Sequence, residues 1–172
     1  MPCSWQKGLS AVASREDYDR FLSEVRKETG IEAMAADESG LVTVRVEDKY
    51  NLNLQYVEAT GRILCFVEVA VLPKDAPKEV YRDLLAGGLF GKDTSGGYFS
   101  LEAESESVVY NYFFDLETAA KDVDDFVSTL EKMLQLCDMW CERIDSRLSD
   151  SAQNQHLDAI PGGFLQNHHI VP

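Results

Sequence analysis

The sequence predicts an α+β domain in which helices pack against a mostly antiparallel, twisted β-sheet. Apolar residues recur at steps of three and four from Val123 to Leu148, which indicates one long amphipathic helix. Between residues 41 and 115, five short segments are rich in β-forming residues and are separated by turn residues or a short helical pattern. The predicted element order is therefore α-β-β-β-α-β-β-α, which is typical of helices packed on a sheet.

The first half of the chain contains one helix and three strands. Ser14, with Asp17 three residues later, resembles a helix N-cap, and Gly30 can end the helix, so a helix is predicted over about residues 14–29. Three strands are predicted next, at residues 41–46, 50–56 and 63–72. The second alternates apolar and polar side chains, as a half-buried strand does, whereas the third is apolar on both faces, as a central strand is.

The second half begins with a short helix and ends with the long one. Pro77 can start the short helix and Gly87-Gly88 can end it, and two strands follow at residues 98–103 and 107–115. Residues 14–148 therefore form the predicted folded domain. Residues 1–13 are predicted to be a loose leader, and residues 149–172, which are polar and lack periodicity, a flexible tail.

Composition and charge narrow the function classes. The 172 residues, 45% of them hydrophobic, suffice for one domain with a core. A net charge of −14 disfavours nucleic acid and anionic membrane surfaces as partners, because both are negatively charged. No apolar run approaches the ~20 residues of a transmembrane helix, and no secretory signal is visible. The four cysteines lack the spacing of a disulfide framework, so a reducing cytoplasm is expected.

No set of residues predicts catalysis or a cofactor. Cys137 and Cys141 lie one helical turn apart, and with histidines of the tail they would give a Cys₂His₂ metal site. Both, however, belong to the apolar stripe of the long helix, where a buried thiol is the ordinary interpretation. The glycines between residues 87 and 97 lack the spacing of a phosphate-binding loop, and residues 14–148 contain no histidine for a catalytic triad. We therefore expect a protein without enzymatic activity, metal or cofactor. A small metal-dependent or thiol enzyme is kept as an alternative, ranked after the two binding functions given below.

The stretch from Leu84 to Leu101 carries a resemblance to a known family. Two glycines, a Leu-Phe-Gly knuckle and a Thr-x-Gly-Gly turn precede an alternating strand, and this order resembles the central signature of the class I type III secretion effector chaperones, the Tir chaperone family. The resemblance covers about residues 14–146 and includes the long helix with Trp140. Gly87-Gly88 is a departure, because a more helix-forming pair would be expected there. The resemblance implies the fold above, a homodimer and a bacterial cytoplasmic protein.

The resemblance also implies a binding function. Members of the family hold the N-terminal chaperone-binding segment of one or a few secreted effectors extended, soluble and export-competent without ATP. The ATPase of the secretion apparatus is a further partner that the resemblance suggests. The alternative, from a different class, is a regulatory or sensory adaptor of the same fold that binds a folded partner protein.

Two sets of apolar residues are the candidate binding surfaces. The first set could line a groove that takes an extended effector segment as an added edge strand: Phe21, Leu22, Val25, Val42, Val44, Leu52 and Leu54. The second set surrounds the end of the short helix, and the family dimerises through this helix and the strand after it: Tyr81, Leu84, Leu85, Leu89 and Phe90. For the first set, the open alternative is that the side chains form the core.

Overall fold

A computed structural model describes residues 13–158 of the chain, with side-chain burial described through residue 151. The predicted leader, except for Ala13, and the last part of the predicted tail lie outside the described residues. The elements are α1 (Arg15–Thr29), β1 (Leu41–Val46), β2 (Tyr50–Val57), β3 (Arg62–Val71), α2 (Lys78–Gly87), the 3₁₀ turn η1 (Leu89–Gly91), β4 (Tyr98–Glu102), β5 (Ser107–Asp115), α3 (Leu116–Lys121) and α4 (Val123–Asp158). The predicted α+β order is confirmed, with η1 and α3 added.

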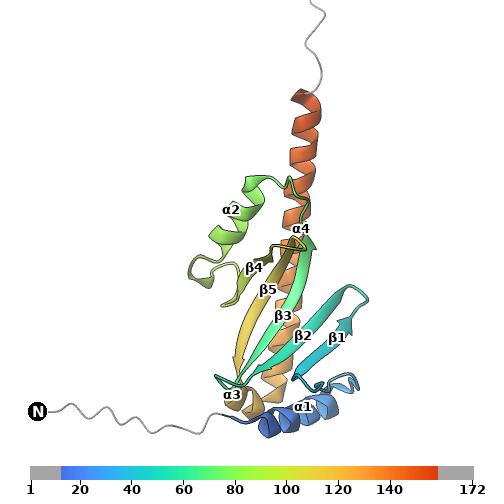
Figure 1. The fold of residues 1–172 in the computed structure, drawn as a ribbon, viewed down its shortest axis with the longest axis vertical. Helices are drawn as coiled ribbons and strands as arrows, with labels where there is room; N and C mark the ends of the chain where they lie inside the picture. Colours follow the sequence, from blue (N-terminus) through green and yellow to red (C-terminus); the bar gives the residue numbers. More distant parts are fainter. Residues whose placement is uncertain (1–12, 159–172) are drawn as a thin grey trace, which may run out of the picture.

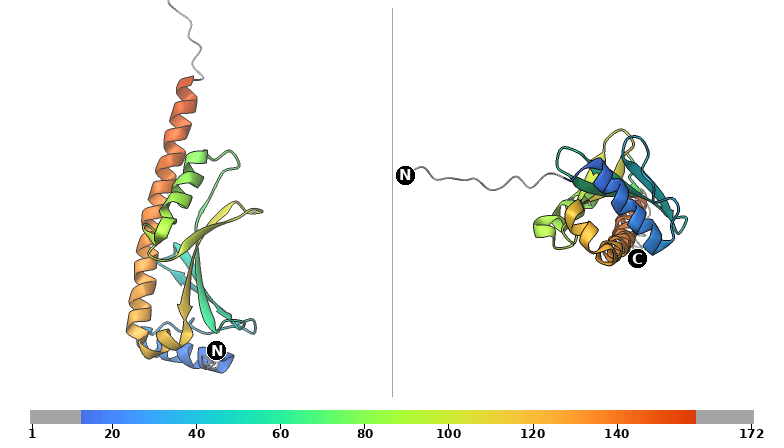
Figure 2. Two further views of the ribbon diagram at one scale, coloured as in Figure 1. Left: turned by 90° about the vertical axis from the view of Figure 1, so that its left-hand side faces the viewer. Right: turned by 90° about the horizontal axis from the view of Figure 1, so that it is seen from below.

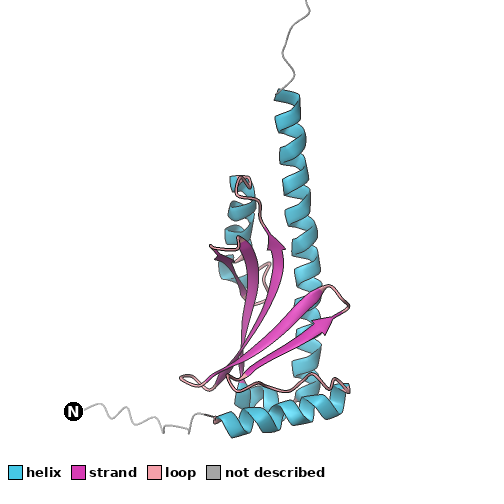
Figure 3. Ribbon diagram, turned by 45° about the vertical axis from the view of Figure 1, so that its right-hand side comes forward, coloured by secondary structure: helices cyan, strands magenta, loops and turns pink. Residues whose placement is uncertain are grey.

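The five strands form one antiparallel sheet in the order β1-β2-β3-β5-β4. The helices α2 and α4 lie on one face of the sheet, and α1 crosses its base beside α3 (Figures 1 and 2). None of the described helices covers the opposite face, which Figure 3 shows towards the viewer. The core therefore lies between the sheet and the helices on one side, and the two edges of the sheet are β1 and β4.

The alternation along the strands decides which side chains enter this core. In β3 the residues Ile63, Cys65, Val67 and Val69 are buried, whereas those between them are half-buried or exposed. Leu64 and Phe66 give the other face of this central strand its apolar character, as predicted. Aromatic rings from separate elements meet at the base of the molecule, where Phe126 of α4 lies 4.9 Å from Phe21 of α1, centroid to centroid.

The N-terminal helix begins and ends as the sequence predicts. Ser14 caps α1, since its hydroxyl accepts from the backbone N–H of Asp17 and the Asp17 carboxylate accepts from the backbone N–H of Ser14. This hydrogen bonding lowers the pKa of Asp17. Gly30 ends the helix in the left-handed conformation, with φ of 69°.

The long helix α4 continues to Asp158, into the segment that the sequence predicts as a tail. The polar residues after Leu148 present no apolar stripe, so the sequence pattern does not extend the helix there. They contain no proline or glycine before Pro161, so nothing in the sequence interrupts the backbone hydrogen bonding of the helix. Figure 1 shows this end of α4 projecting beyond α2 and the sheet. No described helix is both long and apolar enough to cross a membrane.

The close approach of α2 to α4 explains the first glycine, Gly87, of the pair that departs from the family resemblance. A Cβ on Gly87 would lie 2.3 Å from the Trp140 ring, so only glycine allows this contact. Trp140 is itself fixed, because its indole N–H donates to the Asp93 carbonyl over 2.8 Å. Asp83 of α2 also accepts from Arg147 of α4 over 2.8 Å, and this contact lowers the pKa of Asp83.

Candidate binding surfaces

All seven residues predicted to line an effector groove are buried in the protomer, with side chains 0–4% exposed. They face inward because they occupy the alternate strand positions and the helix face that pack towards α4. Leu22, Val25, Val42 and Leu54 line neither of the two larger grooves described below. Val44, Leu52 and Phe21 do line these grooves, so the predicted set falls partly in the core and partly beneath an open surface.

The larger groove, which we call the β1–α4 groove, has a volume of about 510 Å³. It lies between the edge strand of the sheet, the segment that follows α1, and the first half of α4. Its apolar lining consists of Ile31, Met34, Val44, Val46, Leu52, Val127, Leu130 and Leu134. This lining is suited to apolar side chains of a partner, because burying them there removes them from water.

Acidic side chains surround this apolar lining. Glu28 comes from the last turn of α1, and Asp124 and Glu131 come from α4, while no lysine or arginine within the described part of the chain lines the groove. All three carboxylates are exposed, and none forms an ion pair or side-chain hydrogen bond with another described residue. The β1–α4 groove is therefore apolar inside and negatively charged at its border.

The strand that borders this groove has a free edge. β1 is the first strand of the sheet, paired with β2 alone. Among the described residues, the backbone of residues 42–45 forms no hydrogen bond outside the sheet. A strand added there would complete these hydrogen bonds and direct every second side chain towards the groove.

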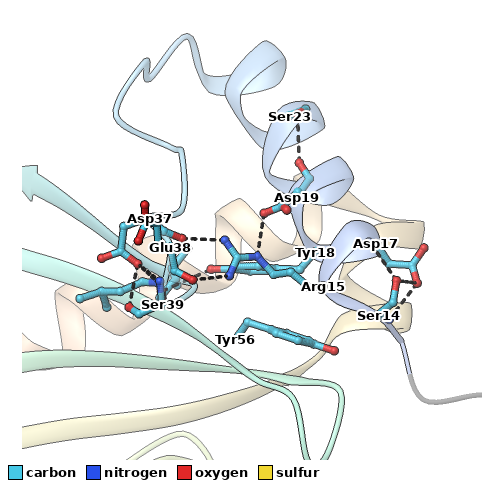
Figure 4. Close-up of polar contacts among 12 residues, drawn as sticks. Ser14, Arg15, Asp17, Tyr18, Asp19, Ser23, Asp37, Glu38, Ser39 and Tyr56 are labelled. Atoms are coloured by element: carbon cyan, nitrogen blue, oxygen red, sulfur yellow. Dashed lines mark hydrogen bonds and ion pairs between the residues drawn. The ribbon is translucent and has the colours of Figure 1, made fainter.

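A polar cluster fixes the start of β1 (Figure 4). The Arg15 guanidinium donates to the Asp37 carbonyl over 2.7 Å and to Asp19 over 3.0 Å, which ties the segment before β1 to α1. The Asp37 carboxylate accepts from the Ser39 hydroxyl over 2.7 Å and from the backbone N–H groups of Leu41 and Ser39, and these hydrogen bonds, that of the hydroxyl first, lower the pKa of Asp37. The edge strand is thus held in place before any partner binds.

A second groove, the α1–α3 groove, has a volume of about 480 Å³ and differs in charge. Its apolar lining comes from Ala13, Phe21, Leu116, Ala120 and Val123. Its charged residues are of both signs: Asp17, Glu24 and Glu117 with Arg20 and Lys121. Arg20 pairs with Asp17 over 3.3 Å, so part of this charge is already neutralised within the chain.

The predicted dimer residues lie on α2 and η1, where several apolar side chains are open to solvent. Phe90 is 96% exposed, Leu85 80% and Leu89 60%, whereas Tyr81 and Leu84 are half-buried against the core. Tyr98 and Leu101 of the edge strand β4 are also exposed. Phe90 has a positive φ of 57°, a conformation that few non-glycine residues adopt, and the backbone there presents its ring to solvent. We use the name α2–β4 patch for the exposed residues Leu85, Leu89, Phe90, Tyr98 and Leu101, of which Tyr98 and Leu101, three residues apart in β4, point to opposite faces of that strand.

Sequence reasoning missed much of the β1–α4 groove. Val127, Leu130 and Leu134 belong to the apolar stripe of the long helix, which the sequence assigns to the core as a whole. Ile31 and Met34 lie in the connection after α1, where no periodicity marks them. One signal in the sequence was available: Asp124 and Glu131 lie on the same helix face as Val127. Charged residues beside an apolar stripe indicate where the stripe meets solvent.

The cysteines of α4 lie where the sequence places them. Cys137 is buried, and burial raises its pKa to about 12, while Cys141 is half-buried and its pKa is raised for the same reason. Among residues 13–151, whose side chains are described, no group of three or more potential ligands is arranged to hold a metal ion. Of the three histidines considered for such a site, His156 lies in α4 beyond the described side chains, and His168 and His169 lie outside the described residues.

The comparisons with known proteins agree with this architecture. The chain matches the Tir chaperone protein (CesT) family over residues 20–140, so it belongs to that family. No curated protein matches the sequence at a significant level. The family and the fold point to a non-enzymatic role.

Three solved structures share the fold. They are the ExsC–ExsE complex (TM-score 0.63, 16% identity, covering 76% of this chain and 95% of that chain) and the HopA1–SchA chaperone–effector complex (0.57, 20%, 74% and 92%). The third is the Yersinia pestis type III secretion chaperone SycH with a stable fragment of YscM2 (0.52, 17%, 69% and 98%). At these identities the likeness establishes the fold.

Proposed function

We propose that this protein is a cytoplasmic, bacterial type III secretion chaperone that binds the N-terminal segment of one or a few effectors. It keeps this segment extended, soluble and export-competent without ATP and without chemistry of its own. The observation that carries the proposal is the β1–α4 groove beside a free strand edge, in a chain of the Tir chaperone family. Similar folds occur in complexes that include a chaperone with its effector.

The groove and the edge strand account for both affinity and selectivity. Backbone hydrogen bonds to β1 accept any extended sequence, whereas the apolar lining selects for apolar side chains at alternate positions. An effector segment kept unfolded would expose those side chains to water, and the groove shields them.

We further propose that two protomers associate through the α2–β4 patch. Leu85, Leu89 and Phe90 are large exposed apolar residues that follow one another closely along α2 and η1, as in an interaction site, and a twofold contact uses the same surface on both chains. Phe90 and Leu85 would be its central contacts, because large apolar side chains supply most of the energy of such interfaces. The ATPase of the secretion apparatus remains a further proposed partner.

The test is co-expression of the full chain with proteins encoded by neighbouring genes, followed by light scattering of the purified complex. We expect two chains of this protein per partner, and the bound partner segment resists protease only in the complex. Leu134→Glu, in the groove, should lose the partner, whereas Leu134→Met should keep it. A partner segment that is cooperatively folded when free would favour the adaptor function. A stable monomer that captures none of these partners would contradict the proposal.

A further inference from the structure

The charge around the β1–α4 groove carries a further inference, which rests on the proposed function. The residues of the described structure that line it include three carboxylates and no basic group. The neighbouring α1–α3 groove, with three acidic and two basic residues, lacks this uniform sign. The two grooves of one chain therefore differ in the charges that line them, and the net charge of the whole chain does not explain this difference.

The acidic residues of α1 also differ in whether they form an ion pair with a described basic residue. Three carboxylates of α1 form ion pairs within the helix: Asp17 with Arg20, Asp19 with Arg15, and Glu24 with Lys27. Glu28, one turn further along α1, has no such partner among the described residues, and neither do the two carboxylates on α4. Carboxylates left unpaired around an apolar groove repel one another, and a cationic group placed between them would relieve that repulsion.

The positions of these groups fit an extended occupant. Asp124 and Glu131 lie seven residues apart on α4, two helical turns, so they occupy one face of the helix and flank Val127 and Ser128. Glu28 lines the same groove from a different element, the last turn of α1. A segment whose apolar side chains enter the groove would thus have carboxylates beside it at more than one point along its length.

We propose that the β1–α4 groove selects an extended segment in which alternating apolar residues are flanked by lysine or arginine. The apolar residues fill the lining, and the basic side chains reach the unpaired carboxylates at the border. Exposed ion pairs contribute little each, but three of them together should favour a basic over an acidic segment by about tenfold at low ionic strength.

The probe is a pair of synthetic peptides with valine at alternate positions and serine between, one with lysine at both ends and one with glutamate. Binding to the full-length protein is measured by fluorescence anisotropy. We expect the lysine-ended peptide to bind about tenfold more tightly. This preference should shrink as salt rises from roughly 0.05 M to roughly 0.5 M, because salt screens exposed charges.

A matched pair of variants locates the effect. Glu28→Gln with Asp124→Asn and Glu131→Gln should abolish the preference for the lysine-ended peptide. Glu58→Gln with Asp75→Asn and Glu142→Gln removes the same charge from exposed residues that line neither groove and should retain the preference. If the first variant fails to fold, the single substitutions Glu28→Gln, Asp124→Asn and Glu131→Gln, each compared with the remote Glu58→Gln, still decide: only the groove substitutions should weaken the preference, and equal effects would overturn the charge selection.

The outcomes separate this inference from the proposed function. Equal binding of both peptides, with Leu134→Glu abolishing both, would overturn the charge selection and leave the groove as the binding site. A preference that the remote variant loses equally would also overturn it, since net charge alone would then explain the result. Absence of binding by either peptide, together with capture of an effector that Leu134→Glu does not weaken, would place the site elsewhere and overturn both.

Discussion

Replacing Gly87 by alanine tests whether α2 approaches α4 as closely as the structure shows. Alanine is the better helix former, so propensity alone predicts a gain of about 1 kcal/mol inside α2. The added Cβ, however, would lie 2.3 Å and 2.6 Å from two carbons of the Trp140 ring. Ordinary carbon contacts are about 3.5–4.0 Å, so ring or helix has to move by more than 1 Å.

Neither partner can move freely. Trp140 is 1% exposed, donates to the Asp93 carbonyl over 2.8 Å and packs edge-on against Phe99, with ring centroids 4.9 Å apart. The helix α2 is tied to α4 by Asp83. Overpacking of this kind costs about 1–3 kcal/mol, and at its upper end it exceeds the gain in propensity. We therefore expect Gly87→Ala to destabilise the protein by up to about 2 kcal/mol in net terms.

The adjacent glycine supplies the control. Gly88 has a helical φ of −72°, and a Cβ there would meet only backbone carbonyl oxygens at 3.5 Å and beyond. Gly88→Ala should therefore be neutral or stabilise by up to about 1 kcal/mol. Urea unfolding at one fixed protein concentration, followed by tryptophan fluorescence, measures both. A stabilisation by Gly87→Ala as large as that by Gly88→Ala would refute the close contact.

Three further predictions concern the binding surfaces and the contact between α2 and α4. Phe90→Asp should convert the proposed dimer to a folded monomer by light scattering, whereas Phe90→Leu should leave it a dimer; a dimer in both cases would place the interface elsewhere. Leu54→Glu should unfold the protein, because Leu54 is fully buried and an unpaired charge there is desolvated, and a folded variant by circular dichroism would contradict its place in the core. Asp83→Asn should lower the urea midpoint at pH 7 by an amount equivalent to about 0.5–1 kcal/mol. Because the folded-state pKa of Asp83 is lowered, its contribution is present above the unfolded value of about 4 and is lost as the pH falls through the folded value, so wild type and variant should converge in acid.

The apolar stripe of α4 shows how far sequence reasoning reaches. Periodicity correctly predicts the helix, because Phe126, Cys137 and Trp140 must face the sheet. It does not separate these from Val127 and Leu134, which line a groove, because core and groove both require apolar side chains. Val127 and Leu134 line a groove because α1 and the segment after it do not cover this part of the stripe. Tertiary packing sets the path of those segments, so the sequence pattern of α4 does not indicate it.

Gly87-Gly88 illustrates a different limit. Read locally, two glycines end a helix, and α2 does end at Gly87. The requirement that fixes Gly87 is a contact with Trp140, more than fifty residues away in the sequence, and no local pattern indicates it. For the residues after the glycines, apolar character and the family resemblance together predict an interface, which stays a prediction; their exposure could not be predicted, because it depends on how α2 and η1 project from the sheet.

The two proposed surfaces lie at different ends of the protomer, and this separation has a consequence for binding. The β1–α4 groove lies near the base, beside α1, whereas the α2–β4 patch lies along the other part of α4 (Figure 1). Pairing through the patch would therefore leave the groove of each protomer open. A partner that occupied both grooves would have to pass from one protomer to the other, which an extended chain can do more readily than a compact domain. One long segment bound in this way would explain a complex of two chains per partner, since the second groove would be filled by the same molecule at high effective concentration.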